Sequence, residues 1–150
     1  SMSSSFTSID FNLFDESNLR FQKDCKSDLK IRTIGLGKSN TSTSGNIIAH
    51  NCPGLDANYQ EKAISASNDC VIASNPILSI DQNDDLTASH GSTIANLDQK
   101  AMHYGRTRGI EEKELITMLL DSFVSPVLPN KEVYNKLELR TMLDLCYEQY

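Results

Sequence analysis

The sequence contains no tryptophan, no long apolar run and no closely spaced pair of cysteines. Its uninterrupted apolar stretches are only a few residues long, whereas a membrane-spanning helix needs about 20 apolar residues, so we expect no membrane span. Residues 1–10 have neither the basic nor the apolar region of a signal peptide, and we expect no secretion signal. Basic stripes with interleaved aromatic residues are also missing and the net charge is −6, which argues against nucleic acid binding.

Four cysteines are present, and they are widely spaced: Cys25, Cys52, Cys70 and Cys146. A disulfide framework is not expected at this density without a secretion signal, so we predict a reducing, cytoplasmic compartment. Taken alone, each cysteine is interpreted as a small buried apolar residue. No catalytic triad, paired carboxylates or phosphate-binding loop stands out, and Gly35-Leu36-Gly37-Lys38-Ser39 lacks the first glycine of such a loop. We therefore expect that the chain is not an enzyme and binds no nucleotide.

The first two thirds of the chain are rich in serine, threonine, asparagine and aspartate. Short stretches of alternating apolar and polar residues predict strands, separated by polar turns. The predicted strands are 8–14, 19–23, 29–36, 45–50, 61–66, 69–74 and 77–81. The hairpin dipeptides Asn-Gly and Asp-Gly are missing, which argues against a meander of tight hairpins. Periodicity alone allows either a sandwich or a stacked solenoid.

Composition changes near residue 98, and the rest of the chain predicts helices. Residues 98–104 form a predicted short helix capped by Asn96 or Asp98. Residues 111–123 form an amphipathic helix, because apolar residues recur at intervals of three and four positions. A last helix is predicted over 131–147, capped by Asn130. We thus divide the chain into a β region, 1–97, and a helical region, 98–150.

Five short motifs follow one another in order between Gly54 and Phe123. They are the strand Asn75-Pro76-Ile77-Leu78-Ser79-Ile80, the turn Asp84-Asp85, the segment Ser89-His90-Gly91-Ser92-Thr93, the segment Tyr104-Gly105-Arg106-Thr107-Arg108-Gly109-Ile110, and the helix ending at Phe123. This ordered set resembles the C-terminal part of the SufB/SufD family of iron–sulfur cluster assembly proteins, and is closest to SufD-type proteins. The resemblance covers about 70 residues and is weaker over 1–53.

The resemblance implies a mainly β fold: a short right-handed parallel β-helix, or solenoid, followed by two to three C-terminal α-helices. It fits Gly91 and Gly109 as sharp turns and Asp84-Asp85 as a turn between coils. The family generally has a longer N-terminal region and more coils. A first coil left exposed would have a sticky edge, so we expect that the chain dimerises or covers this edge with its N-terminal segment.

The resemblance also implies the candidate site residues. His90 corresponds to a family histidine near the interface between SufB and SufD subunits, and Cys70 to a cysteine of SufB-type proteins implicated in cluster assembly. Thiolate and imidazole both ligate iron, so Cys70 and His90 are the candidate ligands of a transient iron–sulfur cluster. The alternatives are a turn histidine bonded to the backbone and an inward-facing packing cysteine. Gly91 stands where SufB-type proteins have an acidic residue, so the chain mixes SufB-like and SufD-like features.

The family's C-terminal helical region docks onto SufC, an ABC-type ATPase, which implies a partner-binding surface here. Its candidate residues are Arg106, Arg108, Leu115, Leu119 and Phe123. The alternative is that the arginines only pair with nearby acidic residues. For Cys25, Cys52 and Cys146 we expect packing roles, and for His103 a surface position. His50 is expected to be solvated or at the edge of the core.

Together these features predict a non-catalytic subunit that scaffolds or supports cluster formation with a SufC-like ATPase and with a SufB/SufD-type subunit or a second copy of itself. One alternative is an ATPase-binding subunit that carries no cluster. The other is an unrelated small β-helix that serves as an interaction module.

Overall fold

The computed structural model describes residues 2–9, 12–20, 25–49, 53–80, 86–127 and 141, with backbone only for 2–9 and 12–20. The described elements are β1 (Met2–Ile9), β2 (Asn12–Arg20), β3 (Lys26–Leu36), β4 (Asn40–Ala49), β5 (Asp56–Ser65), β6 (Val71–Ser74), β7 (Ile77–Ile80), β8 (Thr87–Asn96), α1 (Gln99–Thr107), α2 (Glu112–Val124) and the short 3₁₀ helix η1 (Ser125–Val127).

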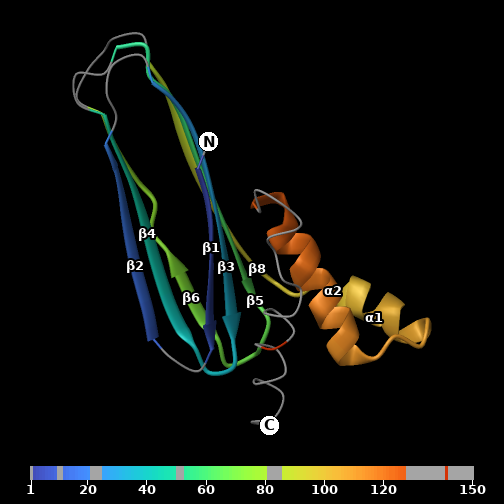
Figure 1. Cartoon of the computed structure of the whole chain (residues 1–150). Coiled ribbons are helices and arrows are strands. Elements are labelled where there is room, and N and C mark those ends of the chain that lie inside the picture. The colour runs from blue at the N-terminus through green and yellow to red at the C-terminus, as the bar shows by residue number, and fades with distance from the viewer. Residues whose placement is uncertain are drawn as a thin grey trace.

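Two parallel sheets make up the β region, and the chain passes back and forth between them (Figure 1). One sheet has the order β1-β3-β5-β8, and in the other β2 pairs with β4, which in turn pairs with both β6 and β7. Side chains that meet on neighbouring strands of the first sheet, such as Asp28 with Asn58 and Asn58 with Ser89, are 30 or 31 positions apart. The predicted mainly β chain of parallel strands followed by helices is therefore confirmed.

Alternate residues of β4 and β5 fill the space between the two sheets, together with residues of β3. In β4 the burial alternates along the strand, with Thr41, Thr43, Ile47 and Ala49 buried. Such a period of two is the pattern of a strand with one face in a core. One interior cluster joins both sheets through Leu29, Ile31, Ile47 and Tyr59, and a second contains Ala49, Leu55 and Ala57.

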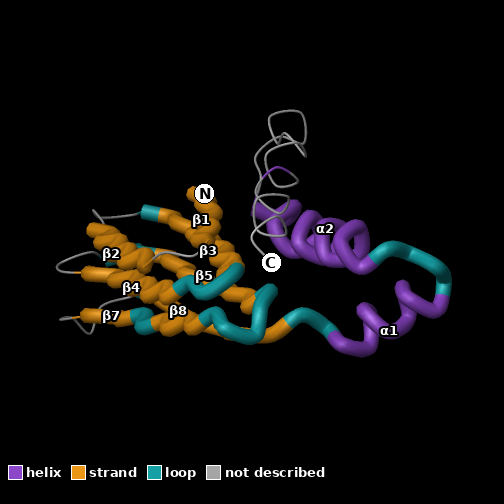
Figure 2. Tube along the Cα trace, turned by 90° about the horizontal axis from the view of Figure 1, so that it is seen from below, coloured by secondary structure: helices purple, strands orange, loops and turns teal. Residues whose placement is uncertain are grey.

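Helix α2 covers part of the outer face of the β1-β3-β5-β8 sheet, as Figure 2 shows. The largest buried cluster lies between helix and sheet, and its members are Ile34, Leu36, Leu97, Met102, Leu115, Ile116, Leu120, Val124 and Val127. Ile34 and Leu36 alternate along β3 with residues that face the interior, so β3 is buried on both faces at this end. One face of β3 therefore packs in the interior between the sheets, and the apolar residues on its other face pack against α2.

Arg32 lies at the edge of this covered region and is only 4% exposed. The Cζ atom of its guanidinium lies over the ring of Phe123, 5.8 Å from the ring centre. The same guanidinium donates a hydrogen bond to the Ile31 carbonyl oxygen, with a donor–acceptor distance of 2.9 Å. Burial lowers the pKa of Arg32 from its usual value.

Both described helices confirm the sequence prediction. Asp98 caps α1 by accepting hydrogen bonds from the backbone N–H groups of Lys100 and Ala101. The turn between α1 and α2 passes through Gly109, whose φ of 78° is a conformation that favours glycine. The predicted helix over 131–147 lies outside the described residues except for Thr141, which is helical. Among the described residues, no helix is both long and apolar enough to cross a membrane.

Two predictions about strands are wrong. The stretch 8–14 was predicted as one strand, but β1 ends at Ile9 and β2 begins at Asn12 in the other sheet. Gly91 was predicted to lie in a sharp turn, but it lies within β8, a ten-residue strand that the sequence did not predict. Pairing with β5 along its whole length holds this segment extended. The Asp84-Asp85 turn and the N-terminal part of the loop before β8 lie outside the described residues.

Candidate functional site

His90 lies in the middle of β8, and its register partner in β5 is Tyr59. Register partners in parallel strands point to the same face, so His90 belongs to the inner face with Tyr59. Tyr59 is buried whereas His90 is exposed, because β8 is the last strand of its sheet and pairs with β5 alone among the described strands. His90 is therefore a strand residue at an open end of the two-sheet stack rather than a turn histidine.

Cys70 lies just before β6 and is partly buried. Its sulfur is 3.3 Å from the hydroxyl of Ser39, and it lies against the backbone of Gly35 in β3. A Cβ atom at Gly35 would be only 2.1 Å from this sulfur. The Cys70 side chain therefore fits at this place only because residue 35 is a glycine.

The two candidate ligands lie far apart within one chain. Gly35, which contacts Cys70, is in register with Ser65, and Ser65 is in register with Asn96 in β8. Asn96 therefore marks the height of Cys70 along the strands, and His90 precedes Asn96 by six positions. Because a strand rises about 3.3 Å per residue, Cys70 and His90 are about 20 Å apart along the strand direction. One chain therefore does not bring Cys70 and His90 into a single ligand set.

The remaining cysteines and histidines have no clustered partners among the described residues. Cys25 packs against the interior cluster of Ala49, Leu55 and Ala57, as expected for a packing residue. His103 is exposed on α1, as predicted. In the described ranges, no group of three or more histidine, cysteine, aspartate or glutamate side chains could hold a metal ion. His50, Cys52 and Cys146 lie outside the described residues.

The two candidate arginines are exposed at the turn between the helices. Arg106 forms an ion pair with Glu112 at 2.7 Å, with about half of each side chain exposed, which is one of the pairings considered from the sequence. The guanidinium of Arg108 lies 5.2 Å from the centre of the Tyr104 ring. Tyr104 is 62% exposed, so this end of α1 presents an aromatic ring and cationic groups to the outside.

The apolar candidates on α2 differ in their exposure. Leu115 is 6% exposed and is part of the core beneath the helix. Leu119 and Phe123 are only partly buried and pack against the same core. Met118, which belongs to the same predicted apolar stripe, is 52% exposed and faces outward from α2.

A buried carboxylate that sequence reasoning missed lies between the two sheets. Glu61 of β5 is fully buried, and its side chain accepts hydrogen bonds from the hydroxyls of Thr43, Tyr59 and Ser74. The distances from Tyr59 and Ser74 are 3.1 and 2.7 Å. Ser74 in turn lies 2.6 Å from the hydroxyl of Ser92 in β8. The sequence contains one sign of this burial. Glu61 follows the same two-residue alternation as Ala57, Tyr59 and Ala63, the residues of β5 that face the interior.

The end of the stack formed by β6, β7 and β8 exposes apolar side chains. Figure 2 shows β7 and β8 along one side of the two sheets and β1 and β2 along the other. The exposed apolar residues of β6, β7 and β8 are Val71, Ile77, Ile80 and Ile94, with exposed fractions of 60%, 46%, 38% and 47%. Of these, Ile80 and Ile94 belong to the inner faces, because their register partners Ala49 and Ala63 are buried. This side, called the open end below, therefore leaves interior positions without cover from a described strand.

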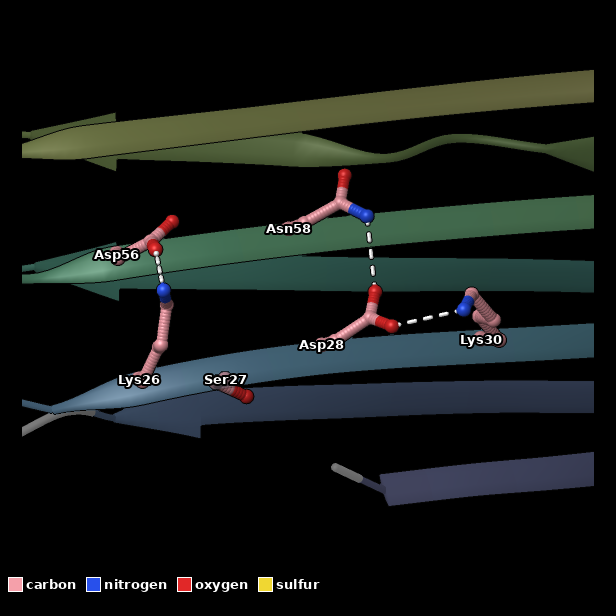
Figure 3. Close-up of a pocket in the computed structure, with 6 residues that line it drawn as sticks. All are labelled: Lys26, Ser27, Asp28, Lys30, Asp56 and Asn58. Carbon is pink, nitrogen blue, oxygen red and sulfur yellow. Dashed lines mark hydrogen bonds and ion pairs between the residues drawn. The ribbon is translucent and has the colours of Figure 1, made fainter.

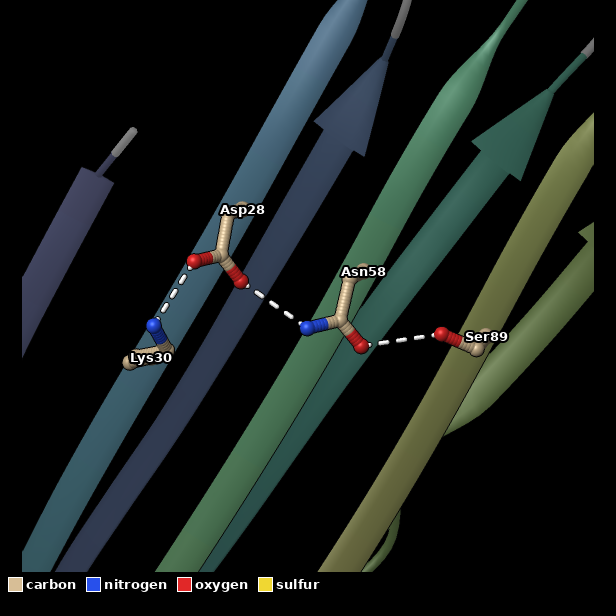
Figure 4. Close-up of polar contacts among 4 residues, drawn as sticks. All are labelled: Asp28, Lys30, Asn58 and Ser89. Carbon is tan, nitrogen blue, oxygen red and sulfur yellow. Dashed lines mark hydrogen bonds and ion pairs between the residues drawn. The ribbon is translucent and has the colours of Figure 1, made fainter.

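A polar hollow of 490 Å³ occupies the part of the outer sheet face that α2 does not cover. It is lined by Lys26, Ser27, Asp28, Lys30, Asp56 and Asn58 (Figure 3). Lys26 pairs with Asp56 at 2.9 Å, and Asp28 pairs with Lys30 at 2.8 Å. The amide of Asn58 donates to Asp28 and accepts from Ser89, which links three neighbouring strands (Figure 4).

The charged side chains that line this hollow pair with one another. The hydrogen bond and charge of Asp56 raise the pKa of Lys26. Hydrogen bonds from Lys30 and then from Asn58 lower the pKa of Asp28. Because these charged groups already have partners of opposite sign, the hollow has the character of a solvated strand face.

The chain matches the family described as "SUF system FeS cluster assembly, SufBD core domain" over residues 17–123. It is 30% identical over 81 residues to the iron–sulfur cluster assembly protein SufD of Bacillus subtilis, a match that covers 54% of this chain and 18% of that protein. It is 29% identical over 65 residues to SufBD family proteins of Mycobacterium bovis and Mycobacterium leprae, covering 43% of this chain and 8% of each relative. The matched part of the chain thus spans less than a fifth of the length of each of these relatives.

The region matched to the family begins within β2 and ends within α2, so it includes the open end, both candidate ligands, α1 and all of α2 except its last residue. It covers well over half of the 150 residues, and the chain therefore belongs to the SufBD family of SUF-system iron–sulfur cluster assembly proteins.

Proposed function

We propose that this chain is a non-catalytic subunit of a SUF-type assembly system, which scaffolds or supports iron–sulfur cluster formation alongside a SufC-like ABC ATPase. The observation that carries the proposal is the family match over residues 17–123, which includes β3 to β8, α1 and all of α2 except its last residue. The same match removes the alternative of an unrelated interaction module. The proposal also includes closure of the two sheets into a right-handed β-helix, which the parallel pairing and the alternation between sheets support.

The proposed ATPase-binding surface lies on the outward side of α1 and α2. Arg106 and Arg108 are exposed beside Tyr104, and Leu119 and Phe123 are partly buried next to exposed Met118. An amphipathic helix can bury one face on its own sheet and offer the other to a partner. The support for this surface is its mixture of apolar and cationic side chains on elements held firmly by the core beneath them.

Co-elution with a SufC-type ATPase on a sizing column at micromolar concentration tests this docking. We expect a joint peak that is weakened by Met118→Asp combined with Arg108→Ala, since these changes place a charge in the apolar part and remove a cation from the rim. The matched control is Lys30→Ala in the polar hollow, on the other part of the sheet face. Separate elution of the unmodified chain and the ATPase would contradict the proposal.

The proposed cluster substrate is held through Cys70 and His90, with ligands contributed by more than one chain. A thiolate and an imidazole nitrogen suit iron, and the exposure of His90 at the open end supports its access to iron. The separation of about 20 Å between the levels of the two residues means that neither can complete the other's ligand set within one chain.

Anaerobic reconstitution with iron and sulfide tests the cluster. We expect an absorption band of an iron–sulfur cluster in the unmodified chain and its loss in both Cys70→Ser and His90→Ala. Cys25→Ser and His103→Ala are matched controls, because Cys25 packs in the interior and His103 is exposed on α1.

A second candidate function is that of an ATPase-binding subunit that carries no cluster. The observation that favours it is the same separation of Cys70 and His90, which do not form a group of three or more potential metal ligands with other described residues. No band in the unmodified chain, or a band that both substitutions leave unchanged, would establish this second function in place of the first.

A further inference from the structure

The buried carboxylate of Glu61 lies among hydroxyl groups and has no cationic partner. Thr43 donates a hydrogen bond to one carboxylate oxygen, and Tyr59 and Ser74 donate to the other. Glu61 is fully buried, and no ion pair among the described residues includes it. An ionised carboxylate has no hydrogen of its own to give, so each hydroxyl beside it must act as the donor.

This carboxylate fixes the direction of the hydrogen bonds that lead from it to the open end. A serine hydroxyl has a single hydrogen, and Ser74 uses its hydrogen on Glu61, with a donor–acceptor distance of 2.7 Å. The 2.6 Å contact between the two serine hydroxyls therefore requires Ser92 to donate to Ser74. The direction of donation runs inward, from Ser92 through Ser74 to Glu61.

Ser92 is the exposed end of this series, and it is in register with Glu61 on the inner face of β8. Its only hydrogen goes to Ser74, so its oxygen offers only lone pairs to a ligand at the open end. Hydrogen bonds in a chain polarise one another, and donation toward a carboxylate makes this oxygen a stronger acceptor. Ser92 therefore favours a ligand that presents a hydrogen-bond donor and disfavours an anion.

His90 lies two positions before Ser92 and faces the same side of β8. Because a strand rises about 3.3 Å per residue, the Cα atoms of the two residues are about 7 Å apart. A metal ion on the imidazole, together with one water molecule bound to that ion, can bridge this separation. A divalent ion draws electron density from its bound water, which makes the water a strong hydrogen-bond donor. The pair thus suits a metal ion that still carries water.

A similar series of hydrogen bonds on the outer face of β8 provides a contrast. Ser89 donates to Asn58 at 2.8 Å, and Asn58 donates to Asp28 at 2.9 Å. This series ends at a carboxylate that is exposed and paired with Lys30 at 2.8 Å. The lysine charge and the solvent screen the charge of Asp28. A series that ends at a buried, unpaired carboxylate therefore occurs on the face of β8 that also carries His90.

We propose that Glu61 is a positioning residue for the iron that His90 binds. Acting through Ser74, it fixes the oxygen of Ser92 as the acceptor for a water molecule on that iron. The inference rests on the proposed function, in which His90 contributes a ligand for the cluster substrate. It adds that iron reaches the open end as a hydrated cation, since an anionic ligand would face the lone pairs of Ser92.

Binding of Co²⁺ alone, without sulfide, tests this inference by isothermal titration calorimetry. Co²⁺ binds imidazole at least as strongly as Fe²⁺, and changing the four native cysteines to serine removes competing thiolates. We expect His90→Ala to abolish binding, and Ser92→Ala to weaken it about threefold to tenfold, the loss expected for one hydrogen bond. Glu61→Gln should weaken it to a similar extent, because the glutamine amide can donate to a hydroxyl and the fixed direction is lost.

A double-mutant cycle then shows whether Glu61 acts through Ser92. The chain with both Ser92→Ala and Glu61→Gln should bind Co²⁺ as tightly as Ser92→Ala alone, since the acceptor is already missing. Losses that add in full would show that Glu61 acts independently of Ser92 and would overturn the inference. Binding equal to that of the parent in both single variants would overturn it as well.

Substitutions of Ser74 keep the inference testable if Glu61→Gln prevents folding, which circular dichroism would reveal. Ser74→Ala releases the hydrogen of Ser92 and should weaken Co²⁺ binding, whereas Ser74→Thr keeps the hydroxyl and should restore it. Ser89→Ala, on the outer face of the same strand, is the matched control and should leave binding unchanged. Equal binding by Ser74→Ala and Ser74→Thr would contradict the proposed series of donors.

Reconstitution with iron and sulfide separates this inference from the proposed function. A chain that binds no Co²⁺ at His90 but still forms the cluster band would overturn only the inference. The expected set of Co²⁺ affinities, combined with no cluster band and no co-elution with the ATPase, would support the inference and overturn the proposed function.

Discussion

The outer face of the β1-β3-β5-β8 sheet has two parts, built on the same strands but with opposite character. Near the ends of the strands, Ile34 and Leu36 lie under α2 and are at most 4% exposed. Near the start, Lys26, Asp28 and Lys30 occupy the same face of β3 and line an open polar hollow. The backbone pairing is continuous through both parts. The helix, rather than the strand geometry, therefore decides which part belongs to the core.

The largest effect is expected where the helix meets the covered part. Leu120 is fully buried there, and Leu120→Ala should lower the free energy of unfolding by about 2–5 kcal/mol, because it removes apolar contacts and leaves a cavity. Met118→Ala on the same helix is the control and should change it by less than about 0.5 kcal/mol. Urea denaturation measures both, and equal losses would mean that α2 does not use the face assigned to it.

An intermediate effect is expected at the boundary between the two parts. Arg32→Lys should cost about 1 kcal/mol, since a lysine ammonium neither stacks on Phe123 as a planar group does nor reproduces the fork of donors. Lys30→Arg, in the polar part, should stay within about 0.5 kcal/mol of the unmodified chain. The same denaturation series compares them, and an unchanged stability of Arg32→Lys would show that the stacking contributes nothing.

The smallest effect is expected in the polar part. The folded-state pKa of Asp28 lies below its ordinary 3.8, so the contribution of its ionised form is present above that pH and is lost as the pH falls through the lower folded value. Exposure and screening limit this contribution to less than about 0.5 kcal/mol. The stability difference between the unmodified chain and Asp28→Asn should therefore shrink between pH 7 and pH 3, and a difference that grows on acidification would contradict this sign.

The strands predicted by alternation largely exist, because burial of one face repeats every second residue within a single segment. Residues 29–36 and 45–50 match β3 and β4 in part, and 111–123 matches α2 to within one residue at each end. β8 was missed because Ser89, Gly91, Ser92 and Thr93 have the composition of a turn. Its extended form depends on hydrogen bonds to β5, about 31 positions earlier in the chain.

The candidate site was predicted only in part for the same reason. The resemblance identified His90 and Cys70, yet their separation of about 20 Å follows from the register of three strands, which no local motif contains. Glu61 would ordinarily be expected on the surface. Its burial is stabilised by hydroxyls of Thr43 and Ser74, which come from two strands of the opposite sheet.

By itself, the sequence determined the family, the mainly β character of the first 97 residues and the two helices that follow them, because motifs, alternation and capping residues act over short distances along the chain. Only the tertiary structure decided the register of the strands, that α2 covers one part of one sheet, and that Glu61 connects the interior to the open end. These features join residues that are from 13 positions apart, as for Glu61 and Ser74, to more than 80 positions apart, as for Ile34 and Leu120. Such contacts depend on register and on burial of the whole core rather than on local preference.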